Sequence, residues 1–167
     1  MRKILVKWIL QVAEKFKANQ ETVHISIQII DYILVFSHKK ITKTNFQLLG
    51  ISALFVASKY NEIYTPEAKK YVYVCDGLYT LEDLFGMESY ILTLTNFNLQ
   101  FPTLNNFVGP LTNNACLGEE FKKVVESLSK MIVLDFNLFN RFKKLHVSGA
   151  ILYLASRLLK IERFSAQ

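Results

Sequence analysis

Four charged side chains lie on helical faces that the sequence otherwise makes apolar, and they are the residues best placed to do chemistry. Lys59 is the only charge in a long uncharged stretch, and Glu88 lies inside an apolar helical arc. Arg2 and Asp31 interrupt the apolar stripes of two earlier segments. A buried charge is costly unless an opposite charge or hydrogen-bonding groups meet it. We expect Arg2 to pair with Asp31. Glu88 needs a cation or donors from this chain or another protein, and Lys59 is the candidate to share its site.

The other reactive side chains form no catalytic or metal-binding pattern. The sequence has no Gly-rich phosphate loop and no nucleophile with a base at motif spacing. Cys75 and Cys116 lack the spacing of metal ligands, and the three histidines are scattered. We therefore expect a binding protein rather than an enzyme, with no cofactor, no metal and no disulfide.

Composition limits the class of partner. The 167 residues are 51% hydrophobic and 20% charged, which is typical of a folded protein of one or two small domains. The formal net charge is +6, but the basic residues form only short runs, which argues against a nucleic-acid partner. The N-terminal MRKILVKW carries lysines through its apolar part, so we expect neither a signal peptide nor a membrane span, and an intracellular protein.

The stretch 44–61 carries Lys59 and must therefore position this charge. It reads TNFQLLGISALFVASKYN and is apolar on every side, which predicts a central helix that other helices cover. Gly50 begins a stripe of small residues along which a neighbouring helix can approach closely. Thr44 and Gln47 have the spacing of a capping box that begins the helix.

Four further helices are expected around this central one, with Asn19 and Thr80 as N-caps of two of them. A third is expected to begin at Thr65 and Pro66. The expected ranges are 1–18, 20–36, about 65 to 76, and 80–95.

A short repeat then divides the chain. LFVASK at 54–59 returns as LYLASR at 152–157, which indicates two tandem copies of one helical unit. No strand pattern is comparably strong, so the expected class is all-α, with a unit of five helices built around the central buried one in 1–101 and a partial second copy in 102–167. That copy has room for helices near 103–111, 118–138 and 146–160. Because 146–160 is apolar on nearly every side, we expect 103–167 to be less stable than 1–100.

Several long motifs in one order resemble a known family. The opening MRKILVKWILQVAEKFK, the central FQLLGISALFVASKYNEIYTPE and the segment 79–99 are similar to mitotic cyclins of the A/B type. The likeness is dense over 1–103 and thin beyond. Residues that this family keeps are present as Arg2, Asp31, Leu48, Lys59 and Glu88. The resemblance implies a first cyclin box, 1–101, and a partial second cyclin box, 102–167.

The resemblance also implies a function, in which the chain binds and activates a cyclin-dependent serine/threonine kinase in cell-cycle control. In the family, the positions of Lys59 and Glu88 bond to backbone near the end of the kinase's mobile regulatory helix, which is thereby held inward. The positions that pack against that helix are Tyr60, Leu92, Phe97 and Leu99. The family acts in the nucleus and the cytoplasm.

A second surface in the family docks substrates and inhibitors that carry Arg-x-Leu motifs. In this chain its positions are Met1, Ile4, Leu5, Trp8, Gln11, Phe46 and Gln47. Gln11 replaces a glutamate that faces the arginine of the motif in A-type members, and Lys7 replaces a common aspartate. We therefore expect weaker discrimination in favour of arginine. An alternative is a tandem cyclin-box protein of the transcription-initiation type that binds DNA or the transcription machinery.

Overall fold

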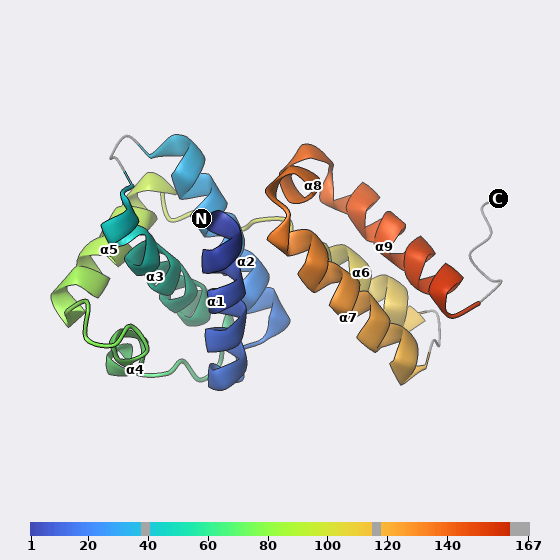
Figure 1. The fold of residues 1–167 in the computed structure, drawn as a ribbon, viewed down its shortest axis with the longest axis horizontal. Helices are drawn as coiled ribbons and strands as arrows, with labels where there is room; N and C mark the ends of the chain where they lie inside the picture. The colour runs from blue at the N-terminus through green and yellow to red at the C-terminus, as the bar shows by residue number, and fades with distance from the viewer. Residues whose placement is uncertain (38–40, 115–117, 161–167) are drawn as a thin grey trace. The chain divides into compact units, whose positions relative to one another are not determined.

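The computed structural model describes residues 1–37, 41–114 and 118–160, and within these ranges the chain is helical with no strand. It divides into two compact units, unit 1 (Met1–Phe101) and unit 2 (Pro102–Gln167). The expected all-α class is confirmed (Figure 1). The helices of the described ranges are α1 (Arg2–Phe16), α2 (Gln20–Phe36), α3 (Lys43–Asn61), α4 (Ala68–Tyr73) and α5 (Leu81–Leu94) in unit 1, and α6 (Leu104–Asn114), α7 (Glu119–Leu134), α8 (Phe136–Arg141) and α9 (Lys144–Leu158) in unit 2.

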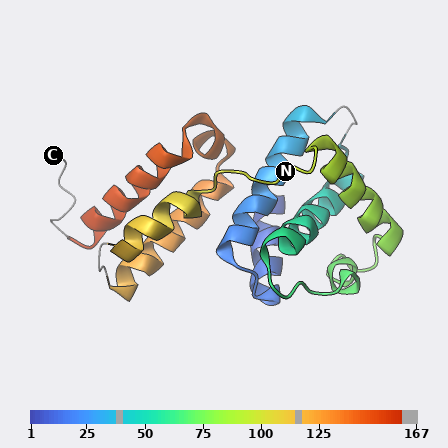
Figure 2. The ribbon, with the colours of Figure 1, turned by 180° about the vertical axis from the view of Figure 1, so that it is seen from behind.

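Unit 1 is built around α3, as its uniformly apolar sequence predicts. Every residue from Leu48 to Ser58 is buried, and α1, α2, α4 and α5 pack against this helix. Figures 1 and 2 show α3 in the middle of the unit from both sides. A Cβ at Gly50 would lie 2.6 Å from Cδ1 of Leu5, so the absence of a side chain there lets α1 approach closely.

The N-terminal caps of α2 and α5 are confirmed. The Asn19 side chain accepts a hydrogen bond from the backbone N–H of Glu21 at 3.0 Å. At α5, the Asp83 carboxylate accepts from the backbone N–H of Thr80 at 2.8 Å, and the Thr80 hydroxyl accepts from the backbone N–H of Asp83 at 3.1 Å. These reciprocal bonds form a capping box, which satisfies donors that a helix start leaves free.

Two expected helix starts are wrong. The helix α3 begins at Lys43, because the amide oxygen of Asn45 accepts a hydrogen bond from the Thr42 backbone N–H at 2.8 Å. Thr44 and Gln47 lie within the helix and form no capping box. The helix α4 begins at Ala68 rather than near Thr65. The Thr65 hydroxyl instead donates to the backbone carbonyl of Ser58 at 3.2 Å, which satisfies an acceptor at the C-terminal end of α3.

A bidentate ion pair joins α1 to α2. Arg2 Nε lies 2.5 Å from Asp31 Oδ1, and Arg2 Nη2 lies 2.7 Å from Asp31 Oδ2. Both side chains are close to fully buried, with 11% and 7% of their surface exposed. Two parallel bonds from a planar guanidinium fix geometry as well as charge. The structure therefore brings together the two charges that interrupt the apolar stripes of these helices.

Unit 2 is a smaller helical bundle. The helix α9 packs against α6, α7 and α8, and Phe121, Phe139 and Ile151 are buried in its core. The expected helix 118–138 is divided, because α7 ends at Leu134 and Asp135 caps a separate α8 by accepting from two backbone N–H groups. In the described part of the chain, no helix has the length and apolar character needed to cross a membrane.

Candidate functional site

An ion pair between α3 and α5 forms the centre of the candidate site. The Lys59 ammonium, in the last turn of α3, contacts Oε1 of Glu88, which lies midway along α5. The Glu88 side chain is 12% exposed and that of Lys59 is 44% exposed, so the pair lies at the rim of the core. Lys59 Nζ also lies 4.3 Å from the centre of the Phe55 ring, which holds the cation by a cation–π contact. Glu88 thus finds its cation within unit 1.

The pair keeps hydrogen-bonding capacity for a partner. An ammonium has three donors and a carboxylate has two acceptor oxygens, and the Lys59–Glu88 contact uses one of each. Within the described residues, neither side chain has a further hydrogen bond or ion pair. Two donors and one acceptor oxygen therefore lie side by side at the rim. Lys59 can therefore donate to a backbone carbonyl of a partner protein while Glu88 accepts from a backbone N–H of the same partner.

The end of α5 positions two of the expected contact residues, Leu92 and Phe97. The Phe97 N–H donates to the Leu92 carbonyl at 2.9 Å, and the Asn96 N–H donates to the Thr93 carbonyl at 3.1 Å. These bonds form a Schellman motif, a helix ending in which the side chains of the two outer residues commonly meet. Asn96 and Phe97 both have positive φ, at 49° and 57°. Phe97 is 73% exposed, so a strained backbone conformation holds an aromatic ring in solvent at the end of α5.

The remaining expected kinase-contact residues are not equally accessible. Tyr60 is half exposed, directly after Lys59. Leu99 is only 6% exposed, so it offers little surface to a partner. Phe85 of α5 is half exposed, and its ring centre lies 6.3 Å from that of Phe55. Phe85 therefore extends the apolar surface beside the ion pair.

Sequence reasoning missed two exposed residues next to α3. Ile63 and Tyr64 are each 91% exposed in the segment that follows the helix. Glu62 fixes the start of this segment, because its carboxylate accepts from the Asn19 backbone N–H at 2.7 Å and from the Thr22 hydroxyl at 2.5 Å. Two large apolar side chains in a polar loop are a signal that the sequence contained, since exposed apolar groups mark binding surfaces.

A separate apolar cavity of about 360 Å³ lies between α1 and the start of α3. It brings together all but one of the expected docking-groove residues, and it adds Lys43, which the sequence did not indicate. Its lining residues are Met1, Ile4, Leu5, Trp8, Lys43, Phe46 and Gln47. Gln47, which has no capping role, thus lines this groove.

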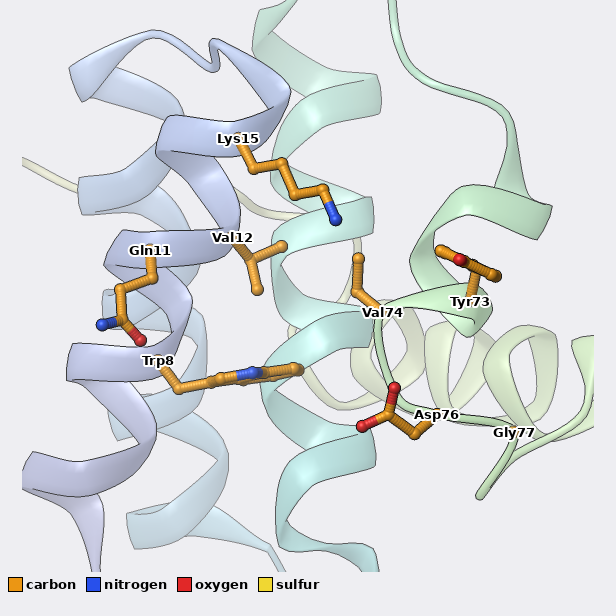
Figure 3. A pocket seen from close by; sticks show the side chains of 8 residues that line it. All are labelled: Trp8, Gln11, Val12, Lys15, Tyr73, Val74, Asp76 and Gly77. Atoms are coloured by element: carbon orange, nitrogen blue, oxygen red, sulfur yellow. The ribbon is translucent and has the colours of Figure 1, made fainter.

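Gln11 is the docking-groove residue that lies elsewhere. It lines a neighbouring cavity of about 520 Å³, whose other wall is formed by Tyr73 and the turn after α4 (Figure 3). Trp8 lines both cavities and is the residue that they share. The expected groove therefore has two compartments, one apolar and one bounded by polar and charged side chains.

The described residues contain no group of three or more side chains arranged as metal ligands. Cys75 is buried and unpaired, and burial is the main cause that raises the pKa of its thiol to about 11. A thiol with this pKa is protonated at neutral pH and is a poor nucleophile. Cys116 lies outside the described residues.

Comparisons with known proteins agree with this arrangement. A model of the family "Cyclin, N-terminal domain" matches residues 1–100, which is most of unit 1. The G2/mitotic-specific cyclin cig2 of Schizosaccharomyces pombe is 32% identical over 96% of this chain and 38% of its own length. Cyclin-A2 of Homo sapiens is 33% identical over 93% of this chain and 36% of its own length. The chain thus spans less than two fifths of these relatives.

A solved structure shows the same fold. The viral cyclin from herpesvirus saimiri superposes with a TM-score of 0.84, covering 98% of this chain and 72% of the viral chain, at 18% identity. The family match over residues 1–100 includes both Lys59 and Glu88 and the helices that position them. The chain therefore belongs to the cyclin family.

Proposed function

We propose that this chain is a regulatory subunit that binds and activates a cyclin-dependent serine/threonine kinase. The observation that carries the proposal is the Lys59–Glu88 pair, which has free donors and a free acceptor oxygen at the rim of an apolar surface. Its relatives, the G2/mitotic-specific cyclin cig2 and Cyclin-A2, support the same class of function.

The site suits the end of a helix. The last turn of a helix leaves four backbone carbonyls without partners, and the helix dipole favours a cation there. The Lys59 ammonium can donate to such carbonyls, while the remaining oxygen of Glu88 accepts a backbone N–H of the segment that follows. Tyr60, Leu92 and Phe97 supply apolar contacts beside these bonds. A regulatory helix held in this way would be fixed in the position that pairs its glutamate with the catalytic lysine of the kinase.

We further propose that the groove around Trp8 docks substrates or inhibitors of the kinase through an apolar side chain. Support comes from the cavity of about 360 Å³, in which Ile4, Leu5 and Phe46 surround the Trp8 indole. Ile4 is 75% exposed, which is unusual for an isoleucine on a folded domain. An apolar side chain inserted here would bury it.

The direct test is to mix the purified chain with purified cyclin-dependent kinases and measure co-elution and phosphorylation of a generic substrate. We expect a stable complex and increased kinase activity with at least one of them. Phe97→Ser should weaken the complex without changing thermal stability, because this ring is solvent-exposed in the free chain. Retention on heparin at physiological salt, with no complex formed by any kinase, would contradict the proposal and support a nucleic-acid-binding cyclin-box protein.

A further inference from the structure

The cavity beyond Trp8 has charged groups on opposite walls. Trp8, Gln11, Val12 and Lys15 of α1 form one wall, and Tyr73, Val74, Asp76 and Gly77 form the other. Figure 3 shows the Lys15 side chain extended across the cavity towards Val74, with the Asp76 carboxylate near the far edge of the indole. Asp76 and Gly77 both have positive φ, at 53° and 72°, so a tight turn fixes the carboxylate in place.

Among the described residues, these two charges have no ion-pair partner. Lys15 and Asp76 form no ion pair with each other, and neither side chain has another ion pair or hydrogen bond within the described residues. Each is therefore available to a ligand that enters the cavity.

The charges that line the apolar cavity and the α1 wall of the second cavity are positive. Lys43 lines the apolar cavity, and Lys15 lines the second one. Lys7 is exposed on the same helix, one turn before Gln11, so Lys7, Gln11 and Lys15 follow one another at four-residue spacing on α1. Among the described residues that line the two cavities, Asp76 is the one acid. Such a surface complements a ligand that carries negative charge beside an apolar group.

We propose that the two cavities bind one extended peptide, which places an apolar side chain in the first and an acidic side chain in the second, paired with Lys15. In an extended chain, side chains two residues apart point the same way and are separated by roughly 7 Å, a distance that can straddle one indole ring. The preferred motif is therefore acid-x-leucine. Asp76 repels the carboxylate from the far wall and directs it to α1. This inference rests on the docking role of the groove and specifies the charge of its ligand.

Three peptides that differ only at the residue two positions before a leucine test the proposal, with glutamate, alanine or arginine there. Fluorescence anisotropy should give the tightest binding for glutamate, about two- to fivefold tighter than alanine, because an exposed pair contributes modestly. Arginine should bind most weakly. The preference should shrink as salt is raised, since the groups are solvent-exposed.

Variants separate the contributions of the two walls. Lys15→Met should make glutamate and alanine peptides equal, and Lys15→Glu should reverse the order in favour of arginine. Asp76→Asn should tighten binding of the glutamate peptide. Lys3→Met is the matched control, because Lys3 is an exposed lysine of α1 that lines neither cavity, and it should leave the order unchanged.

The outcomes distinguish this inference from the docking function. Trp8→Ala should remove binding of all three peptides if the groove is the docking site. Peptides that bind with no charge preference, or with arginine preferred, would overturn the acid-x-leucine inference and leave the docking function standing. If none of the three peptides binds the unmodified chain, both the docking function and this inference are wrong.

Discussion

The helices α3 and α9 carry matching sequences, LFVASK and LYLASR, but their surroundings differ. Every residue of α3 from Leu48 to Ser58 is buried, whereas α9 has one buried face and one exposed face. At equivalent positions of the repeat, Val56 is 2% exposed and Leu154 is 49% exposed. The shared motif therefore specifies a helix, and the neighbouring helices decide whether that helix becomes the centre of a core.

The basic residues that end the two motifs, Lys59 and Arg157, also differ in their surroundings. Lys59 meets Glu88 because α5 packs beside α3 and presents a carboxylate to its last turn. Arg157, at the equivalent position of α9, is exposed and has no ion pair within the described residues. A cation at the end of a repeated helix is thus not a site by itself. The acid from a second helix and the apolar surface around it make the site in unit 1.

Breaking the Arg2–Asp31 pair of unit 1 should give the largest effect on stability. Asp31→Ala leaves Arg2 charged and nearly buried, so we expect a loss of about 3 to 5 kcal/mol in the free energy of unfolding. The exposed Glu119–Lys122 pair of unit 2 is the matched control, and Glu119→Ala should cost less than about 0.5 kcal/mol. Denaturant unfolding followed by fluorescence of Trp8, the single tryptophan, reports on unit 1. Equal small effects of both variants would contradict the assigned burial.

Shortening the side chains at equivalent positions of the repeat tests the difference in burial between α3 and α9. Val56→Ala removes two buried methyl groups from α3 and should destabilise unit 1 by roughly 2 kcal/mol. Leu154→Ala removes partly exposed groups from α9 and should cost roughly 1 kcal/mol or less. Hydrogen exchange resolves the two helices separately. We expect slower exchange in α3 than in α9 before any substitution, and equal protection would show that the two helices are equally well covered.

Helix caps also differ between the units. Thr80→Ala should cost about 1 kcal/mol, because the Thr80 hydroxyl accepts the Asp83 N–H at the start of α5. The helix α7 begins at Glu119, and its N-cap residue Gly118 offers no side-chain cap, so Gly118→Ser should stabilise it by a few tenths of a kcal/mol. Thermal melts of the two variants, compared with the parent chain, should shift in opposite directions. A stabilising Thr80→Ala substitution would rule out the capping box.

The smallest expected effect is a pH dependence of the α5 cap. Hydrogen bonds from the backbone N–H and the hydroxyl of Thr80 lower the pKa of the Asp83 carboxyl. A carboxyl whose folded-state pKa is lowered stabilises the fold above its unfolded pKa, and this contribution is lost as pH falls through the lowered value. Asp83→Asn should therefore flatten the acid side of the stability profile of unit 1. An unchanged profile would mean that other carboxyls account for all of the acid sensitivity.

Much of unit 1 could be predicted from the sequence, because its signals are local or depend on burial. The absence of charge in 44–58 predicts a central helix, and lone charges on apolar faces identify Arg2, Asp31, Lys59 and Glu88. The start of α3 could not be predicted reliably. Thr42 and Thr44 both offer a side-chain oxygen before an apolar run, and the choice depends on Asn45.

The details of the site depend on tertiary structure that the sequence does not encode locally. The sequence does not show that Leu99 is buried while Phe97 is exposed, since a Schellman motif and two left-handed residues decide it. The separation of Gln11 from the apolar groove depends on the turn at Asp76, which lies 65 residues away along the chain. In unit 2, the exposure of Leu154 depends on which helices pack against α9.

Kinase activation by a paired variant tests the role of unit 1 most directly. Lys59→Ala combined with Glu88→Ala removes both charges, so no buried carboxylate is left without a partner and the fold should persist. Losing two charge-assisted bonds to the kinase should reduce activation by roughly a hundredfold, as measured by substrate phosphorylation at fixed concentrations. Arg157→Ala, at the equivalent position of unit 2, should leave activation unchanged. Full activation by the folded double variant would contradict the assignment of the Lys59–Glu88 pair as the kinase-binding site.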